Sequence, residues 1–301
     1  MVFLKRMGLF LLTNLLVLLT ISIVWGFVSQ ALHLTGLSSN MTLLLAFCFV
    51  WGMGGAFISL LLSKWMAKMA MGVQVIEPDT ANPDLRRLVS QVHELSRRAG
   101  LDEMPEVGIF ESPDLNAFAT GPTRNNSLVA VSTGLLQRMT DAEREGVIGH
   151  EIAHIANGDM VTMTLIQGVV NAFVMFFARI VAGIVASQFE ERNRNWIRFM
   201  VTFVAEIAFS VLGMMVVSAF SRYREFRADA GGAGLAGRDK MIAALLKLKQ
   251  VYELPLDEGM EDNQNVATLM ISSRSKGGLR SLFMTHPSLD DRIDALRNPK
   301  V

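Results

Sequence analysis

The hydrophobic positions of the chain gather in four long runs separated by polar stretches. The first two runs, 7–32 and 34–63, carry no charged side chain, and the later two carry one charge each. About 20 apolar residues cross the hydrocarbon core of a bilayer, so each run is long enough to span it. We therefore predict four transmembrane helices. Their expected positions are about 7–32, 36–63, 160–187 and 199–221.

Two of these runs have alternatives. Lys5 and Arg6 precede the first run as they would in a signal peptide. The apolar stretch is too long for a signal peptide and no A-x-A site follows it, so we predict an uncleaved anchor. The later pair could instead form a buried hairpin of a soluble domain, but its length and hydropathy favour the membrane.

Lysine and arginine positions set the expected orientation. Lys5 and Arg6 precede the first span, Lys64 and Lys68 follow the second, and the loop between the spans has neither residue type. Both ends of this hairpin are thus expected in the cytoplasm. The 188–198 loop, with three arginines and two glutamates, counts against that topology, but first spans usually dominate.

The polar stretches predict a small folded part. Asn82 and Pro83 form a helix start, and Gly100 an end. Strand-like runs follow at 106–110, 116–120 and 128–132, separated by turn residues, which favours an antiparallel sheet. The expected fold is a mainly α membrane protein with a small antiparallel β-sheet. Its expected parts are a first membrane pair (1–63), a cytoplasmic part (64–159), a membrane hairpin (160–221) and a second cytoplasmic part (222–301).

Composition narrows the classes of function. Of 301 residues, 51% are hydrophobic and 19% charged, and Lys+Arg and Asp+Glu both number 28. Without a basic excess, a nucleic-acid partner is not expected. Cys48 is the single cysteine, which excludes an intrachain disulfide framework and a metal site made of several cysteines.

One motif carries recognisable chemistry. Thr140 and Glu143 form a capping box that opens a helix, and His150 and His154 follow on it. Positions i and i+4 share a helix face, so both imidazoles can bind one zinc ion. Glu151 can then act as general base on a water at the metal. The pattern predicts a zinc hydrolase with a third protein ligand elsewhere.

The third ligand has several candidates. They are Glu190, Glu191, Glu206, Glu225, Glu253, Glu258, Glu261 and His286. Glu225 is favoured because it follows the last span on the same side as His154, and Asp229 lies one turn further on, suited to holding a ligand histidine. The alternative is a surface carboxylate paired with Arg222 or Arg224. Since a membrane hairpin separates His154 from Glu225, the metal site is expected at the cytoplasmic membrane surface.

These residues resemble the HtpX family of heat-shock membrane zinc metalloproteases, relatives of the CAAX prenyl proteases. The resemblance covers nearly the whole chain. It rests on residues 11–15, 63–66, 116–121, 150–160, 224–229 and 284–287. It implies a gluzincin-type protease domain combined with four transmembrane helices in the bacterial inner membrane.

The resemblance also implies roles for individual residues. His150, His154 and Glu225 would bind one zinc ion per chain, Glu151 would be the base, and Asp229 would orient His150. His286 would stabilise the oxyanion, with Arg292 as its partner. The strand of Asn116, Ala117, Phe118 and Ala119 would hold an extended substrate. Without the resemblance, His286 would be assigned to a surface turn and Arg292 to a solvated helix surface. The strand would be an ordinary core strand.

The implied function is an endopeptidase that cleaves damaged or misfolded membrane proteins, with peptide substrates and the lipid bilayer as partners. One alternative is a prenyl-protease activity on C-terminal tripeptides, although such relatives generally have more spans. Another is a transporter or a zinc-binding scaffold without catalysis. Glu151 separates an enzyme from a scaffold, because a scaffold has no need of the acid.

Two further expectations concern the remaining segments. Arg179 and Glu206 lie at matching depths in the second hairpin, so we predict an ion pair between them, with Gln167 or Asn171 adding polar contacts. The alternative is that Arg179 reaches the membrane surface and Glu206 is protonated or faces water. The polar segment 255–280 is expected to be a mobile surface loop.

Overall fold

The structure is a computed structural model that describes residues 41–253 and 283–298. The first predicted span and the 255–280 segment lie outside the described residues. The chain divides into two compact units. One combines Met1–Gly55 with Gln167–Val216, and the other combines Ala56–Ile166 with Val217–Val301.

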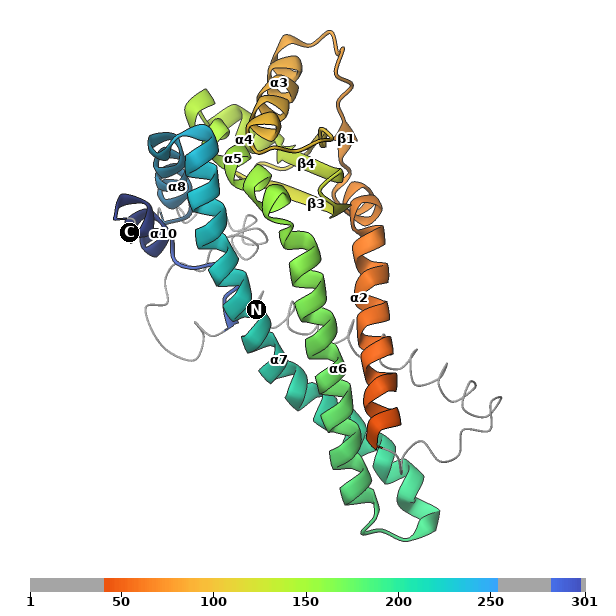
Figure 1. The fold of residues 1–301 in the computed structure, drawn as a ribbon. Coiled ribbons are helices and arrows are strands. Elements are labelled where there is room, and N and C mark those ends of the chain that lie inside the picture. The colour runs from red at the N-terminus through yellow and green to blue at the C-terminus, as the bar shows by residue number, and fades with distance from the viewer. Residues whose placement is uncertain (1–40, 254–282, 299–301) are drawn as a thin grey trace. The chain divides into compact units, whose positions relative to one another are not determined.

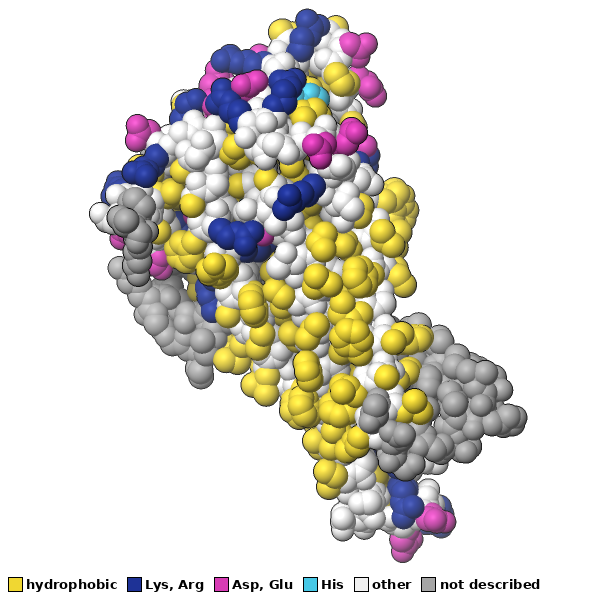
Figure 2. Space-filling model, viewed as in Figure 1, with side chains coloured by type: hydrophobic (Ala, Val, Ile, Leu, Met, Phe, Trp, Pro, Cys, Tyr) yellow, Lys and Arg dark blue, Asp and Glu magenta, His cyan; other side chains and the backbone are white. Residues whose placement is uncertain are grey.

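Three long apolar helices run through these units (Figure 1). They are α2 (Met41–Met71), α6 (Asp159–Ala186) and α7 (Glu191–Ala236). Each is long and apolar enough to cross a membrane, and at most 28% of each apolar window is buried. Hydrophobic side chains cover much of their visible surface (Figure 2). So much exposed apolar surface fits lipid contact rather than a buried hairpin, and the chain is a multi-pass membrane protein.

The helix bounds refine the predicted spans. The second predicted span corresponds to α2, which continues past Ser63 to Met71, and the third corresponds to α6. The fourth is only the middle of α7, which carries on without a break through Glu225 and Asp229. The same helix that crosses the bilayer therefore carries the two carboxylates into the second unit.

The ion pair predicted within the second hairpin is confirmed. Arg179 Nη1 lies 3.1 Å from Glu206 Oε1 and also donates to the carbonyl oxygen of Met175. The guanidinium lies 5.8 Å from the ring centroid of Phe47 on α2. The Glu206 side chain is 5% exposed, so its charge is balanced by Arg179 rather than by water. Gln167 and Asn171 bind each other on α6.

The sheet belongs to the second unit and has four strands in the order β1-β2-β4-β3. Its strands are β1 (Gln74–Val75), β2 (Glu106–Phe110), β3 (Ala117–Thr123) and β4 (Asn126–Ser132). The expected antiparallel sheet is wrong in one pairing, because β2 runs parallel to β4, with Glu106 opposite Leu128. The connection after β2 carries the chain past the position of β4, and the β3–β4 hairpin then inserts β4 at the centre. This leaves β3 at an edge.

The helices of the second unit cover this sheet and enclose its core. They are α3 (Pro83–Arg98), α4 (Thr133–Arg138), α5 (Asp141–Asn157), α8 (Arg238–Glu253) and α10 (Leu289–Arg297). The Asn82 side chain caps α3 by accepting from the backbone N–H of Asp84 and Leu85, as predicted. Val92, Val131, Ile152, Leu245 and Leu289 are fully buried together. This core fixes α5 between the sheet and α8.

The end of α2 is attached to the sheet by charge. Lys64 Nζ lies 3.0 Å from Glu106 and donates to the Asn126 side chain at 2.8 Å. Lys68 Nζ lies 2.5 Å from the other oxygen of Glu106. The two lysines that indicate the orientation of the second span thus also bind the sheet to the end of α2.

Candidate active site

Helix α5 is defined at both ends by its sequence. Thr140 accepts from the backbone N–H of Glu143, while the Glu143 side chain accepts from the backbone N–H of Thr140. Gly158 ends the helix with φ +69°, a conformation that costs glycine little. His150 and His154 lie one turn apart on it, and their rings meet edge to face with centroids 4.6 Å apart.

A close approach of α5 and α7 brings the remaining groups to these histidines. A Cβ atom built on Gly232 would lie 2.8 Å from the backbone nitrogen of His150. Gly231 and Gly149 border the same contact. Only hydrogen at these positions lets the two backbones come so near. Glu225 and Asp229 precede Gly232 on α7 and therefore face the histidines.

Three buried side chains converge at one point. The ligand atoms of His150, His154 and Glu225 all lie within 4.8 Å of one another. The Nε2 atoms of the two histidines are 3.1 Å apart. Glu225 Oε2 lies 3.5 Å from His150 Nε2, and Glu225 Oε1 lies 3.4 Å from His154 Nε2.

Each histidine is held from behind by a carboxylate. Asp229 Oδ1 lies 2.9 Å from Nδ1 of His150, and Asp159 Oδ2 lies 2.6 Å from Nδ1 of His154. Asp229 is among the residues predicted from the sequence, and Asp159 is not. Its position directly after Gly158, the glycine that ends α5, is the one indication in the sequence. Whether the Asp159 side chain points toward His154 depends on the direction in which α6 starts.

The donor set fits a divalent metal ion. When Nδ1 of each ring donates to its carboxylate, the two Nε2 lone pairs face the same point, 3.1 Å apart, together with a carboxylate. Three electron-rich atoms brought together in a buried place favour a cation among them. Two imidazoles and one carboxylate are a ligand set that catalytic zinc sites use, with one position open for substrate or water.

The charges around His150 are strongly coupled. Burial by itself would lower the pKa of His150, but hydrogen bonds to Asp229 and Glu225 outweigh it and raise the pKa to about 10. A metal that binds Nε2 must therefore displace a firmly held proton.

His286 and Arg292 reach the site from the C-terminal segment. His286 Nδ1 lies 2.9 Å from Glu225 Oε2, and the ring is one-third exposed. The resemblance pairs Arg292 with His286, but the structure places its guanidinium on Asp229, with Nε and Nη2 donating at 2.7 and 2.6 Å. The Arg292 side chain is 7% exposed and is therefore not a solvated charge. Burial opposes its charge, yet Asp229 raises the pKa of Arg292.

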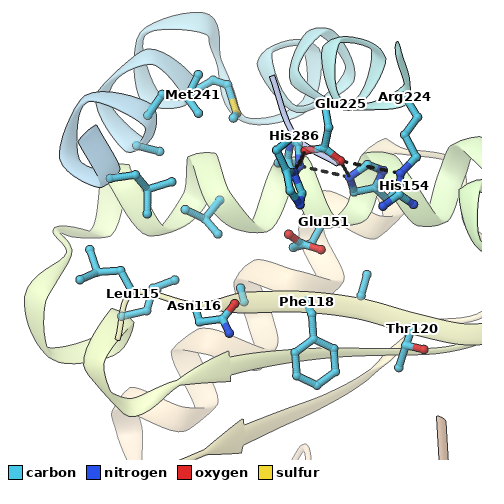
Figure 3. A pocket seen from close by; sticks show the side chains of 18 of the residues that line it. Leu115, Asn116, Phe118, Thr120, Glu151, His154, Arg224, Glu225, Met241 and His286 are labelled. Atoms are coloured by element: carbon cyan, nitrogen blue, oxygen red, sulfur yellow. Dashed lines mark hydrogen bonds and ion pairs between the residues drawn. The ribbon is translucent and has the colours of Figure 1, made fainter. Parts of the chain in front are cut away.

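A cleft of about 460 Å³ runs along these groups (Figure 3). Strand β3 borders it with Ala117 to Thr120, and Asn116 lies just before the strand. Glu151 points from α5 toward β3, and His286 lies near it (Figure 3). The cleft thus brings together all the residues predicted to be catalytic, to bind the metal or to hold the substrate, whereas Asp229 lies behind His150.

The sequence profile of Peptidase family M48 matches residues 82–300. The chain belongs to this family. Within M48 it is similar to Protease HtpX homologues: it is 52% identical to one from Bacillus licheniformis, over 97% of this chain and 98% of the relative. It is 51% identical to Protease HtpX from Aeromonas salmonicida, over 97% and 99% of the two chains.

A solved structure agrees in fold. The crystal structure of S. mikatae Ste24p matches with a TM-score of 0.59 and 17% identity, over 95% of this chain. The chain spans 65% of the length of that protein, and the likeness concerns the fold alone. As an M48 member of the HtpX type with three described apolar helices, the protein is a membrane metalloprotease.

Proposed function

We propose that the protein is a zinc-dependent endopeptidase that cleaves damaged or misfolded membrane proteins under stress. One zinc ion would be held by His150, His154 and Glu225. When bound, it would polarise the scissile carbonyl and make water acidic enough to react near neutral pH. The observation that carries the proposal is the buried convergence of these three ligand atoms beside Glu151 in the cleft.

Glu151 is the proposed general base. It lies next to the ligand His150 on α5 and its side chain faces the cleft (Figure 3). There it would take a proton from the attacking water and return it to the leaving amine. A scaffold that only binds metal would have no use for a carboxylate aimed at the substrate space. This position therefore favours an enzyme.

The groups behind the ligands are proposed to orient them. Asp229 would hold His150 and Asp159 would hold His154, which sets the tautomer of each ring. Arg292 would act through Asp229, because its guanidinium binds both oxygens of that carboxylate. His286 is better placed to stabilise the oxyanion, since it lines the cleft and is partly exposed.

The substrate would add to the edge of the sheet. Among the residues that the structure describes, strand β3 pairs with β4 on one side only, and its residues border the cleft. An extended peptide laid along Asn116, Ala117, Phe118 and Ala119 would gain main-chain hydrogen bonds that do not depend on its sequence. Such tolerance suits a protease that must accept many unfolded segments.

The proposed location is the bacterial inner membrane with the cleft on the cytoplasmic side. Lys64 and Lys68 at the end of α2 support this orientation, since cytoplasmic flanks carry an excess of basic residues. Glu225 lies on the same helix as the fourth predicted span and close to its end, so the cleft would lie near the membrane surface.

Proteolysis by purified protein tests the function. A model membrane protein should be cleaved in detergent, and a chelator should stop cleavage until zinc is restored. Glu151→Gln should keep about one zinc per chain and lose cleavage. If that variant cleaves at the native rate, Glu151 is not the base. If the native protein binds zinc and cleaves no peptide or protein, the scaffold alternative replaces the enzyme.

A further inference from the structure

Arg224 stands directly before the proposed ligand Glu225, and its role is open. Its side chain lines the cleft and is 29% exposed. In Figure 3 it lies beside His154 and Glu225, on the side of the cleft where Thr120 lies. A guanidinium carries five N–H donors in a planar fork and stays charged at any physiological pH.

One donor of Arg224, its Nε atom, lacks a matched acceptor among the described residues. Its Nε lies 3.8 Å from Glu225 Oε1, which is beyond hydrogen-bond distance. That Nε is buried and has no hydrogen-bond partner among the residues that the structure describes. A guanidinium with an unmatched N–H is poorly stabilised, and the side chain is 29% exposed, so an anionic ligand that contacts its exposed part would be favoured.

The neighbouring arginines are matched by contrast. Arg292 binds both oxygens of Asp229, and Arg227 lies 3.4 Å from Asp159. Both of these carboxylates also hold a histidine. Their charges therefore belong to the support of the site, whereas that of Arg224 faces the space that a substrate would fill.

Glu225 cannot neutralise Arg224 by itself. Its two oxygens already lie 2.9–3.5 Å from His150, His154 and His286. A divalent cation bound by His150, His154 and Glu225 would neutralise the carboxylate of Glu225. With such a cation in place, Glu225 would have less negative charge left to offset that of Arg224.

Much of the cleft lining is apolar, including Ala67 and Met71 of α2 and Met241 and Leu245 of α8. The charged lining residues other than Arg224 have proposed roles elsewhere: Glu151 is the base, Glu225 a metal ligand, and Arg292 binds Asp229. Arg224 is therefore the charged residue of the cleft that is left to contact a charged group of the substrate.

We propose that Arg224 is a specificity-determining residue that binds a substrate carboxylate at the Thr120 end of the cleft. The carboxylate would come from an acidic side chain or from the C-terminus of the substrate chain. The same guanidinium would repel lysine and arginine at that position. This inference rests on the proposed peptidase function, and it names a preference within it.

A peptide series tests the preference. Starting from one cleavable peptide, Glu, Gln or Lys would be placed at one position at a time around the scissile bond. Each of these peptides would be made once with a free C-terminus and once with an amidated C-terminus. At one position, the native protein should cleave the Glu peptide about 10-fold faster than the Lys peptide, as one charge-assisted hydrogen bond allows. A free-acid advantage without a Glu advantage would assign the carboxylate to the chain terminus.

Variants assign the effect to Arg224. In Arg224→Gln and Arg224→Met the Glu-to-Lys ratio of kcat/KM should fall to near one, and in Arg224→Glu it should invert. Arg97→Gln removes an exposed arginine of α3 and should leave the ratio as in the native protein. Zinc content would be measured for every variant. Only variants that retain about one zinc per chain would be used to compare the Glu-to-Lys ratio.

A binding measurement separates this inference from the proposed function. In a Glu151→Gln background, a fluorescent Glu peptide should bind about 10-fold more tightly than its Lys counterpart, and adding Arg224→Gln should remove the difference. If both peptides bind equally with Arg224 present, or if the preference survives Arg224→Gln, the inference is wrong even though the protein cleaves peptides. If the charge preference in binding is found and cleavage is not, the proposed function is wrong, and Arg224 selects the charge of a bound peptide without being a specificity residue for cleavage.

Discussion

Asp159 Oδ2 lies 2.6 Å from Nδ1 of His154, and Asp159 is also the first residue of the membrane helix α6. The start of a transmembrane helix is therefore part of the support of a candidate metal ligand. The carboxylate is buried at 2% exposure and also lies 3.4 Å from Arg227 of α7. Displacing α6 would disturb His154 directly.

Removing the Asp159 carboxylate should weaken metal binding. We expect Asp159→Ala to lower zinc affinity about 10- to 100-fold, because a ligand histidine without its carboxylate loses its fixed tautomer and some basicity. Competition with a chromophoric chelator measures it. Arg227→Gln, which removes only the other partner of Asp159, should change the affinity much less. Equal losses in both variants would show that Asp159 acts through Arg227.

The close approach of α5 and α7 gives a steric prediction. Gly232→Ala should displace α5, because the new Cβ would lie 2.8 Å from the backbone nitrogen of His150. We expect a loss of about 1–3 kcal/mol in stability and a loss of zinc. Thermal unfolding in detergent and metal analysis measure these effects.

Gly234→Ala is the matched control on the same helix. A Cβ there meets nothing within 4 Å. It should keep zinc and gain up to about 1 kcal/mol, since alanine favours the helix over glycine. If the two variants behave alike, the contact between the helices is not tight.

Metal removal should destabilise the second unit. Zinc that binds only the folded chain adds about 4 kcal/mol at 1,000 times its Kd. A chelator should therefore lower the unfolding temperature of the native protein, which a detergent-phase melt would record. In His154→Ala, where the site is already broken, the chelator should change little. An equal shift in both proteins would place the stabilising metal elsewhere.

The ion pair in the membrane hairpin predicts non-additive losses. Arg179→Leu or Glu206→Leu alone should each cost about 3–5 kcal/mol, because each leaves one charge without its partner. The double variant Arg179→Leu with Glu206→Leu should be more stable than either single variant. Unfolding in detergent measures all three. Losses that simply add would mean that the two charges do not stabilise each other.

The attachment of α2 to the sheet should depend on pH. Burial would raise the pKa of Glu106, but Lys68 and Lys64 outweigh it and hold the pKa below its ordinary value of 4.5. These ion pairs therefore stabilise the fold above about pH 4.5 and lose that contribution as pH falls through the lower folded value.

Glu106→Gln isolates this effect. The difference in unfolding temperature between the native protein and this variant should be present at pH 7 and shrink toward pH 4. Glu106 is 39% exposed, so the contribution should stay below about 1 kcal/mol. A difference that grows as the pH falls would have the wrong sign for this pairing.

Much of the local structure could be predicted from the sequence because neighbouring residues encode it. Uncharged runs indicated the apolar helices, and Thr140 with Glu143 marked the start of α5. The spacing of His150, Glu151 and His154 placed two ligands and a base on one helix. Glu225 and Asp229 could be selected because helix geometry relates positions four apart.

The tertiary structure decided what depends on residues far apart in the chain. Turn residues show where a strand ends but not which other strand it pairs with or in which direction. The parallel pairing of β2 with β4 could therefore not be predicted from them. Asp159 reaches His154 only because Gly158 turns the chain where α5 ends and α6 begins. Arg292 binds Asp229 rather than His286 because α10 packs against the core at Leu289 and Ile293. Local patterns follow from backbone periodicity, whereas such contacts arise only when separate elements bury their apolar faces together.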